Sequence, residues 1–587
     1  MKKTFDLDDP TLRDCAVSAA RGDRPFDVLI TGARIADILT GELRAADIGI
    51  CGALIASVHA PGTRNEAPVI YDATGLIATP GLIDSHMHVE SSMVTPEIYA
   101  AAILPRGVTT IVWDPHEFGN VAGIAGMDYA LKAAERSDLR ILPLVPSCVP
   151  SAPGYETTGA DFTAEIIGRL MERPGIAGLA EVMDMVAVTN RTPRMRAILD
   201  VASQSRKMIC GHARSLSGSQ LQAYITSGVT SDHEVTSAND LLEKLRTGLT
   251  LELRSSHPYL LKDFAETLQA LAQMPATVTF CSDDVFPDDL LATGGVDNML
   301  RLMVGHGLDP LRAVQAATLN PTIRLGRSDI GLIGPGKRAD IVLFEDLIDF
   351  KAVHVFRNGK PIDKEEATSQ VPSAFLKTVD LSPIDPSSFT VKAQGPHARV
   401  AVIAKPRFTK WDEAIVNVLD GVVVPPSNST MIAVINRFSG SDANPTVGFL
   451  SDWGDWDGAF ATTISHDSHN LTVFGSDADQ MAIAANALIA AGGGMAVVHQ
   501  YRVIAILPLP VAGLVSTAPL AEVAADFATV RVAMDQVVTW QPPYLTFKAL
   551  VGATLACNPG PHQTDLGIAD PHSGKLLRSP VLEDGLN

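Results

Sequence analysis

The sequence predicts an α/β protein: a (β/α)₈ barrel of the TIM type, flanked by a β-sandwich and followed by a C-terminal α/β domain. Three observations favour this fold. Gly-punctuated β segments near the N-terminus return after residue 320. Between them, apolar strand candidates alternate with amphipathic helical stretches. A different mixture of strands and helix follows from about residue 376.

The first β region reads FDVLITGARIAD, ADIGICGALIASVHA and VIYDATGLIATP. Gly and Asp separate its β-branched runs, as hairpin turns require. The segments LGRSDIGLIGPGKRADIVLFED and FKAVHVFRNGKPI repeat this character on the far side of the central region. We therefore expect residues 1–78 and 326–375 to pair into one β-sandwich domain, built from both sides of the barrel.

The central region, residues 79–325, contains eight apolar strand candidates: 81–88, 107–114, 141–147, 176–182, 207–213, 228–234, 249–255 and 277–283. Stretches such as GMDYALKAAERS and RMRAILDVASQS lie between them, with apolar spacing near 3.6 residues. Eight near-continuous apolar strands alternating with helices suit a closed parallel barrel of about 250 residues. An open doubly wound sheet is the structural alternative.

Residues 376–587 read as a separate α/β domain with several strands and one clear helix, DADQMAIAANALIAA. The Gly triplet at 492–494 follows that helix and precedes a strand. We expect it to form a tight turn and not a phosphate-binding loop.

The composition excludes several classes of protein. The chain has 587 residues, with 66 Asp and Glu against 46 Lys and Arg, and a formal charge of -20 argues against nucleic acid or an anionic membrane as the main partner. Its six cysteines are scattered without a CxxC pair, as in a reduced cytosolic protein. We find no secretory signal and no apolar run of about 20 residues, so we expect a cytoplasmic protein.

The strongest chemical signal is His86-x-His88, at the end of the first barrel strand. Residues i and i+2 of a strand face the same side, so both imidazoles can converge on one ion. Four further donors stand at the C-terminal ends of predicted strands 4, 5, 6 and 8, where barrel enzymes build their sites. They are Glu181, His212, His233 and Asp283.

These six side chains suit Zn, Fe or Mn, and they exceed the three or four ligands that one zinc ion uses. We therefore expect two ions bridged by Glu181. The ions would lower the pKa of a shared water, and Asp283 would take its proton and pass it to the leaving group. Asp284 is the alternative ligand, but strand alternation aims only one of the two inward, and we favour Asp283. The reaction class is metal-assisted hydrolysis.

A second group follows predicted strand 2 in WDPHEFGN. Asp114, His116 and Glu117 are free to act on a substrate, or Asp114 and Glu117 could hold a third metal. The plainer interpretation is a turn at Asp114-Pro115 with a solvated Glu117. Glu90 follows the HxH pair and gives H-x-E, but the P-C-x-x-C of the small zinc deaminases is missing from the sequence. Glu90 could still contact the substrate or support the metal ligands.

The segment SHDSHN carries His466 and His469 with Asp467 between them. This group could bind a further metal. Because the spacing is i, i+3 in a predicted loop without other donors near it in sequence, we favour a structural or domain-contact element.

PGLIDSHMH, the His and Asp set at the strand ends and IGPGKRADIVLFED together resemble the amidohydrolase superfamily. Within it, HMHVESSM, WDPHEFGNVAG, GLAEVMD, GHARSL, SDHEV, CSDDVFPDDL and the C-terminal SHDSHN resemble the adenine deaminase family. The resemblance covers nearly the whole chain. It implies hydrolysis of adenine to hypoxanthine and ammonia in purine salvage, at a binuclear Mn or Fe site that Zn could also occupy. The ring nitrogens of adenine accept hydrogen bonds, and protonated carboxyl groups could donate to them. The resemblance also implies a homo-oligomer, with a dimer favoured.

Two alternatives remain open. Many binuclear members of the superfamily, such as cyclic-amide hydrolases, bridge their metals with a carboxylated lysine. Strand 4 has Glu181 instead, so these hydrolases are disfavoured. Hydrolysis of a cyclic amide or of another aminated heterocycle at the same site is the second hypothesis. A non-catalytic scaffold would lack ligands, and the sequence has all six.

Overall fold

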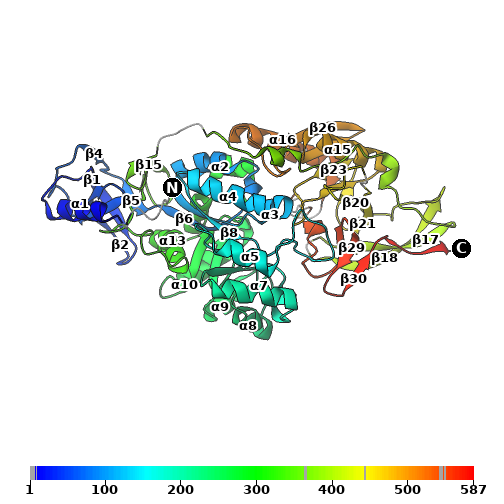
Figure 1. Cartoon of the computed structure of the whole chain (residues 1–587), viewed down its shortest axis with the longest axis horizontal. Coiled ribbons are helices and arrows are strands. Elements are labelled where there is room, and N and C mark those ends of the chain that lie inside the picture. The colour runs from blue at the N-terminus through cyan, green and yellow to red at the C-terminus, as the bar shows by residue number, and fades with distance from the viewer. Residues whose placement is uncertain are drawn as a thin grey trace.

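The computed structural model describes residue 7 and residues 9–362, 367–406, 408–441, 444–540, 547, 550 and 552–586. The remaining residues of the expected sandwich range (1–6, 8 and 363–366) and of the C-terminal range lie outside this description. The molecule is elongated, with the N-terminal strands at one end, the parallel strands in the middle and the C-terminal unit at the other end (Figure 1). None of the helices in the described residues is long and apolar enough to cross a membrane.

Strands from both sides of the central region form one eight-stranded sheet, ordered β16-β15-β14-β5-β1-β2-β3 with β4 beside β1. Its strands are β1 (Val28–Asp37), β2 (Glu42–Cys51), β3 (Leu54–His59), β4 (Val69–Asp72), β5 (Ile77–Pro80), β14 (Ile341–Phe344), β15 (Ala352–Arg357) and β16 (Lys360–Pro361). Helix α1 (Pro10–Arg21) packs on β2 and β3. The antiparallel pair β5 and β14 therefore joins segments that are about 260 residues apart in sequence.

Each of the eight predicted segments of the central region contains a strand. They are β6 (Leu82–Met87), β7 (Val108–Trp113), β8 (Arg140–Val145), β9 (Gly178–Val182), β10 (Met208–Gly211), β11 (Ser231–Asp232), β12 (Thr250–Arg254) and β13 (Val278–Cys281). They form parallel sheets ordered β10-β9-β8-β7-β6 and β11-β12-β13. Hydrogen bonds connect these sheets at both seams: Thr230 N donates to Ile209 O over 2.9 Å, and Asp283 N donates to His86 O over 3.1 Å.

Helices cover the outside of these parallel strands (Figure 1). They are α2 (Pro96–Ile103), α3 (His116–Ala122), α4 (Ile124–Arg136), α5 (Ala164–Met171), α6 (Met185–Thr189), α7 (Pro193–Gln204), α8 (Gly218–Thr226), α9 (Ala238–Arg246), α10 (Leu261–Ala270), α11 (Pro287–Thr293), α12 (Val296–Gly305), α13 (Pro310–Ala317) and α14 (Leu319–Arg324). Local chemistry sets their ends. For example, Asp309 caps α13 by accepting from Leu311 N and Arg312 N, and Pro310 occupies the first turn, where its missing N–H costs nothing.

The C-terminal unit is built on a ten-stranded sheet, ordered β19-β18-β17-β21-β20-β24-β23-β25-β26 with β31 beside β17. Its strands are β17 (His397–Ala404), β18 (Lys410–Leu419), β19 (Val422–Val423), β20 (Ser429–Ile435), β21 (Thr446–Ser451), β23 (Ala459–Thr462), β24 (Leu471–Gly475), β25 (Gly494–His499), β26 (Arg502–Pro508) and β31 (Val581–Leu586). Smaller sheets pair β22 (Asp455–Trp456) with β27 (Val538–Thr539), and β28 (His562–Thr564), β29 (Gly567–Asp570) and β30 (Lys575–Leu577).

The prediction of one clear helix in this unit was wrong, because α15 (Ala478–Ala491) is joined by α16 (Leu520–Val537). The buried positions of α16 recur at helical spacing: Val523, Ala524, Phe527, Val530, Ala533, Met534 and Val537. The Gly triplet forms the predicted turn, since Gly492 ends α15 in the left-handed conformation and Gly494 begins β25.

Candidate metal centre

The first two histidines reach the centre of the parallel sheet from β6. His86 lies within the strand and His88 directly after it. His88 Nδ1 lies 3.0 Å from the carbonyl oxygen of Asp114, so it donates there and leaves Nε2 free to bind an ion. This hydrogen bond orients the ring of His88, and the strand periodicity places His86 and His88 on the same side of the chain.

The structure gathers the six predicted donors around Glu181, which lies in β9. Its Oε1 is 3.6 Å from His88 Nε2, and its Oε2 is 2.7 Å from His212 Nδ1 and 3.2 Å from His233 Nε2. On the other side, Asp283 Oδ1 is 3.8 Å from His86 Nε2 and 3.6 Å from His88 Nε2. All six residues are at most 6% exposed.

This donor set fits divalent transition metals. Both nitrogens of His86, Nε2 of His212 and Nδ1 of His233 are buried without a hydrogen bond among the described residues. The donor atoms form two overlapping groups that could each hold an ion, one of His86, Glu181 and His233 and one of His86, His88 and Asp283. Imidazole and carboxylate donors without thiolate suit Zn, Fe and Mn.

The carboxylates of the cluster are held in their ionised form. Burial alone would raise the pKa of Glu181, but His233 and His212 outweigh it and hold that pKa well below its usual range. The pKa of Asp283 is lowered in the same way, with burial outweighed by the Arg254 guanidinium and by His88. Arg254 donates to Asp283 Oδ2 over 2.9 Å and to Glu234 over 2.7 Å.

The two neighbouring aspartates take different places. Asp283 faces the cluster, whereas Asp284 accepts a 2.6 Å hydrogen bond from Ser91 Oγ. Asp283 has a left-handed backbone conformation, φ 61°, two residues after the end of β13, and its side chain faces the cluster.

Asp114 lies beside the cluster but has both oxygens engaged. They accept hydrogen bonds from His116 N and Glu181 N, each over 3.2 Å. Glu90 is likewise engaged, since it accepts from the indole of Trp113 over 2.8 Å. Both carboxylates therefore position the backbone and the ring around them.

Glu117 differs from these two acids. It is 1% exposed, and neither of its oxygens has a hydrogen bond among the described residues. Burial raises its pKa in spite of the nearby His466 and His116. Burial and the charge of Glu117 raise the pKa of Glu90 to about 8. Burial therefore favours the protonated form of each acid.

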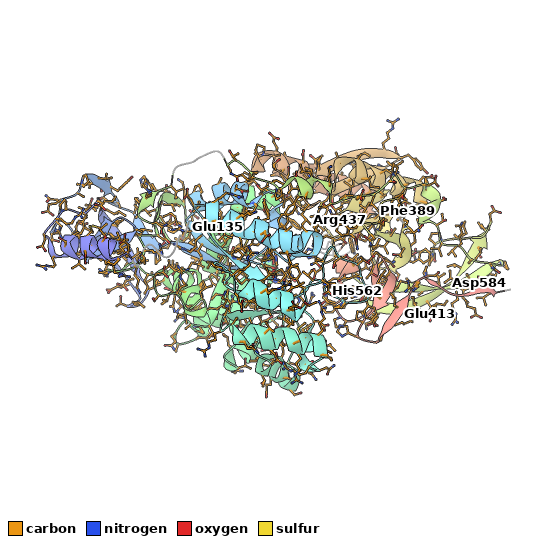
Figure 2. The ribbon with its side chains drawn as sticks, viewed as in Figure 1. Glu135, Phe389, Glu413, Arg437, His562 and Asp584 are labelled. Atoms are coloured by element: carbon orange, nitrogen blue, oxygen red, sulfur yellow. The ribbon has the colours of Figure 1, made fainter. Side chains whose placement is uncertain are left out.

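A cavity of about 150 Å³ opens onto five of the six donors, His88, Glu181, His212, His233 and Asp283. Its wall includes His88, Glu181 and Asp283 from the strand ends, and His466 and His562 from the C-terminal unit. Figure 2 shows His562 on the side of that unit that faces the barrel helices. A larger cavity of about 410 Å³ shares only Met183 with this wall and contains none of the six donors.

Sequence reasoning missed Arg254 and Glu234. Both could have been recognised in the sequence. Arg254 lies near the end of the predicted strand LTLELRS, and Glu234 directly follows His233. It also placed His466 and Asp467 in a loop without neighbouring donors. In the structure this loop, residues 463–470, lies against the turn that carries His116, with His116 Nε2 3.8 Å from Asp467 Oδ1.

A parallel α/β sheet with histidine and carboxylate donors at its strand ends defines a hydrolase of the metal-dependent type. The sequence model of the amidohydrolase family matches residues 77–362, and that of the adenine deaminase C-terminal domain matches residues 406–575.

Relatives match along nearly the whole chain. An adenine deaminase 2 of Rhizobium meliloti is 56% identical, over 99% of both chains, and that of Agrobacterium fabrum is 56% identical over 98% of both. An adenine deaminase of Klebsiella pneumoniae is 46% identical, over 96% of this chain and 95% of its own. The chain belongs to the adenine deaminase family. Its fold is accordingly a curled parallel sheet of the TIM type with a C-terminal domain.

Proposed function

We propose that this protein hydrolyses adenine to hypoxanthine and ammonia. The observation that carries the proposal is the similarity to adenine deaminases over the full length, which includes both the strand-end donors and the C-terminal unit. The reaction replaces the exocyclic amine of a purine with oxygen and belongs to purine salvage.

We propose that two divalent ions would be held by His86, His88, Glu181, His212, His233 and Asp283. Mn²⁺ or Fe²⁺ fits these donors, and Zn²⁺ is compatible with them. Bound ions would supply a Lewis acid that makes water a nucleophile at neutral pH.

The protein's own residues would move the protons. Asp283, kept ionised by Arg254, would accept the proton of the attacking water and return it to the departing amine. Glu117, kept protonated by burial, would donate to a ring nitrogen of adenine. Asp114 and Glu90 would act on the substrate indirectly, through the backbone and ring contacts described above.

We also propose that the eight parallel strands close into a barrel. Support comes from the hydrogen bonds at both seams and from the parallel bridge between Met87 and Asp283. The domains would then be residues 79–325 for the barrel, 1–78 with 326–375 for the β-sandwich, and 376–587 for the C-terminal domain. The eight-stranded sheet supports the second of these, because it contains strands from both segments.

A cytoplasmic location is supported by the six cysteines, which are all free. A homodimer is supported by the edge strand β26, which exposes Val503, Ile504 and Ile506. Light scattering of the purified protein would measure its mass in solution.

The function is tested by measuring ammonia release from adenine, with hypoxanthine followed by its absorbance. Apoprotein reconstituted with Mn²⁺ or Fe²⁺ should turn over adenine, and Glu181→Gln should be inactive. Glu165→Gln is the matched control, because Glu165 is an exposed helix residue. If the loaded wild type ignores adenine but opens a cyclic amide or deaminates another heterocycle, the substrate assignment is wrong.

A further inference from the structure

A second group of metal-type donors lies where the C-terminal unit meets the barrel. His116 starts α3 at the end of β7, and His466 and Asp467 come from the loop 463–470. One ligand atom of each residue lies within 4.8 Å of the others. The loop is fixed from behind by Arg437, which donates to His469 O over 2.8 Å and lies on the barrel-facing side of the unit (Figure 2).

Asp467 is the anomalous member of this group. Its side chain is 0% exposed, and neither carboxylate oxygen accepts a hydrogen bond from any residue that the structure describes. A buried carboxylate is unfavourable unless it is paired or binds a metal. Its nearest nitrogens are His466 Nδ1 at 3.4 Å and His116 Nε2 at 3.8 Å.

These separations are long for direct ion pairs. A hydrogen bond from an imidazolium to a carboxylate spans about 2.7–2.9 Å. Two donors that share one ion with bonds of about 2.1 Å lie roughly 3.0–3.4 Å apart, in octahedral or tetrahedral geometry. The contacts of Asp467 are closer to the second case. They also match the separations of 3.2–3.8 Å between most donors of the barrel cluster.

The orientation of His116 supports the same interpretation. His116 Nδ1 faces the carboxylates of Asp114 and Glu181 at 3.3 and 3.7 Å, and Nε2 is directed at Asp467; neither ring nitrogen has a hydrogen bond among the described residues. A carboxylate behind one imidazole nitrogen and a metal at the other is a common arrangement in metal sites.

His116 also belongs to a candidate group with His88, Asp114 and Glu181, and His466 to one with Glu117 and His469. The second of these groups is less suitable. His469 Nδ1 accepts a hydrogen bond from Ser465 N, so its Nε2 carries the proton and is not available to an ion.

We propose that His116, His466 and Asp467 bind a third divalent cation, separate from the two ions of the barrel. The nitrogen and oxygen donors suit Mn²⁺, Fe²⁺ or Zn²⁺. Because one ligand comes from the barrel and two come from the C-terminal unit, the ion ties the two parts together beside the cavity.

The metal content of the holoprotein tests this proposal. After reconstitution with excess Mn²⁺ and desalting, wild type should hold three ions per chain, and Asp467→Asn and His466→Ala should each hold two. His499→Ala is the matched control and should keep three, because His499 pairs at the surface with the exposed Asp457. A wild type with two ions, or variants that keep three, would overturn the proposal.

Crystals of the Mn²⁺-loaded wild type give a second readout that does not depend on how the variants fold. Anomalous scattering at the manganese edge should show a peak between His116, His466 and Asp467. Density at the barrel ligands without this peak would refute the third site. Neither experiment uses adenine, so a wrong substrate assignment would leave both results interpretable.

Discussion

At the scale of single residues, the site contains acids of two kinds. Asp283 and Glu181 are buried beside cationic groups that hold their pKa values low, whereas at Glu117 and Glu90 burial outweighs the neighbouring groups and raises the pKa. Glu181 and Asp283 line the cavity, whereas Glu117 and Glu90 are buried outside its lining, so the two environments favour a proton acceptor in one place and a proton donor in the other. This division is what hydrolysis of an aminated ring requires.

Glu117 gives the first prediction. If its protonated carboxyl donates to the purine ring, Glu117→Ala should lower kcat/KM for adenine by about 10²-fold or more. Glu117→Gln keeps an N–H donor of similar size and should recover part of that loss. Steady-state kinetics with metal content measured in parallel would check this. Equal activity in the Gln and Ala variants would exclude the donor role.

Glu156, a buried acid outside the six donors, gives a prediction about stability. Burial raises its pKa to about 8, although it accepts hydrogen bonds from Ser151 Oγ and Ala152 N. The unfolded chain ionises this group near pH 4.5, so folding stability falls as the pH rises from there to about 8. A pKa raised from 4.5 to about 8 sets a ceiling of about 5 kcal/mol on this loss.

Glu156→Gln removes the titrating proton and keeps an oxygen for both hydrogen bonds. Its melting temperature should match wild type near pH 5 and exceed it increasingly towards pH 8. Thermal melts at several pH values measure this difference, with exposed Glu165→Gln as the control. A difference that does not change with pH would contradict the assignment.

At the scale of elements, the position of the loop 463–470 depends on the turn between α15 and β25. Gly494 has φ 128°, and a Cβ there would lie 1.9 Å from the carbonyl oxygen of Leu507 in β26. Gly494 also donates to Thr463 Oγ1 over 2.8 Å, at the start of the loop. A side chain at this position would therefore disturb both the strand pair and the loop that carries His466.

Gly494→Ala should lower the free energy of unfolding by about 3 kcal/mol, since it adds backbone strain and a clash in a buried strand. Gly305→Ala is the matched control, because nothing lies within 4 Å of that position at the end of α12. The control should be neutral or slightly stabilising. Urea denaturation measures both, and equal midpoints for the two variants would exclude this account.

The elements and the donors were predictable to different degrees. The eight central strands follow from short apolar runs, and His86, His88, Glu181, His212, His233 and Asp283 stand at or just after their ends, so local pattern was sufficient to place them. The contact between His116 and Asp467 was not predictable, because it joins positions about 350 residues apart through the docking of two units. Arg254 could have been identified from its place at the end of β12.

At the scale of the whole molecule, the barrel and the C-terminal unit share one continuous apolar core. Phe286 follows β13 and its ring lies 5.1 Å from that of Phe527 in α16. Arg531, also in α16, pairs with Asp288 over 2.7 Å. The backbone N–H of Ser516 donates to Met93 O over 2.8 Å, in the segment between β6 and α2. The C-terminal unit and the barrel are therefore packed against each other as one body.

This shared core predicts that the barrel and the C-terminal unit unfold together. Phe527→Ala removes a ring that is 0% exposed and should cost about 3–5 kcal/mol. Calorimetry of the metal-loaded protein should show one transition for both parts, shifted down in the variant, with deaminase activity lost at the same temperature. Val532→Ala on the same helix is the control, since Val532 is 63% exposed and should leave the midpoint nearly unchanged. Two resolved transitions, with activity lost at the one that the variant does not shift, would show instead that the barrel maintains its site without the C-terminal unit. The part of the cavity wall that the C-terminal unit supplies would then have no part in catalysis.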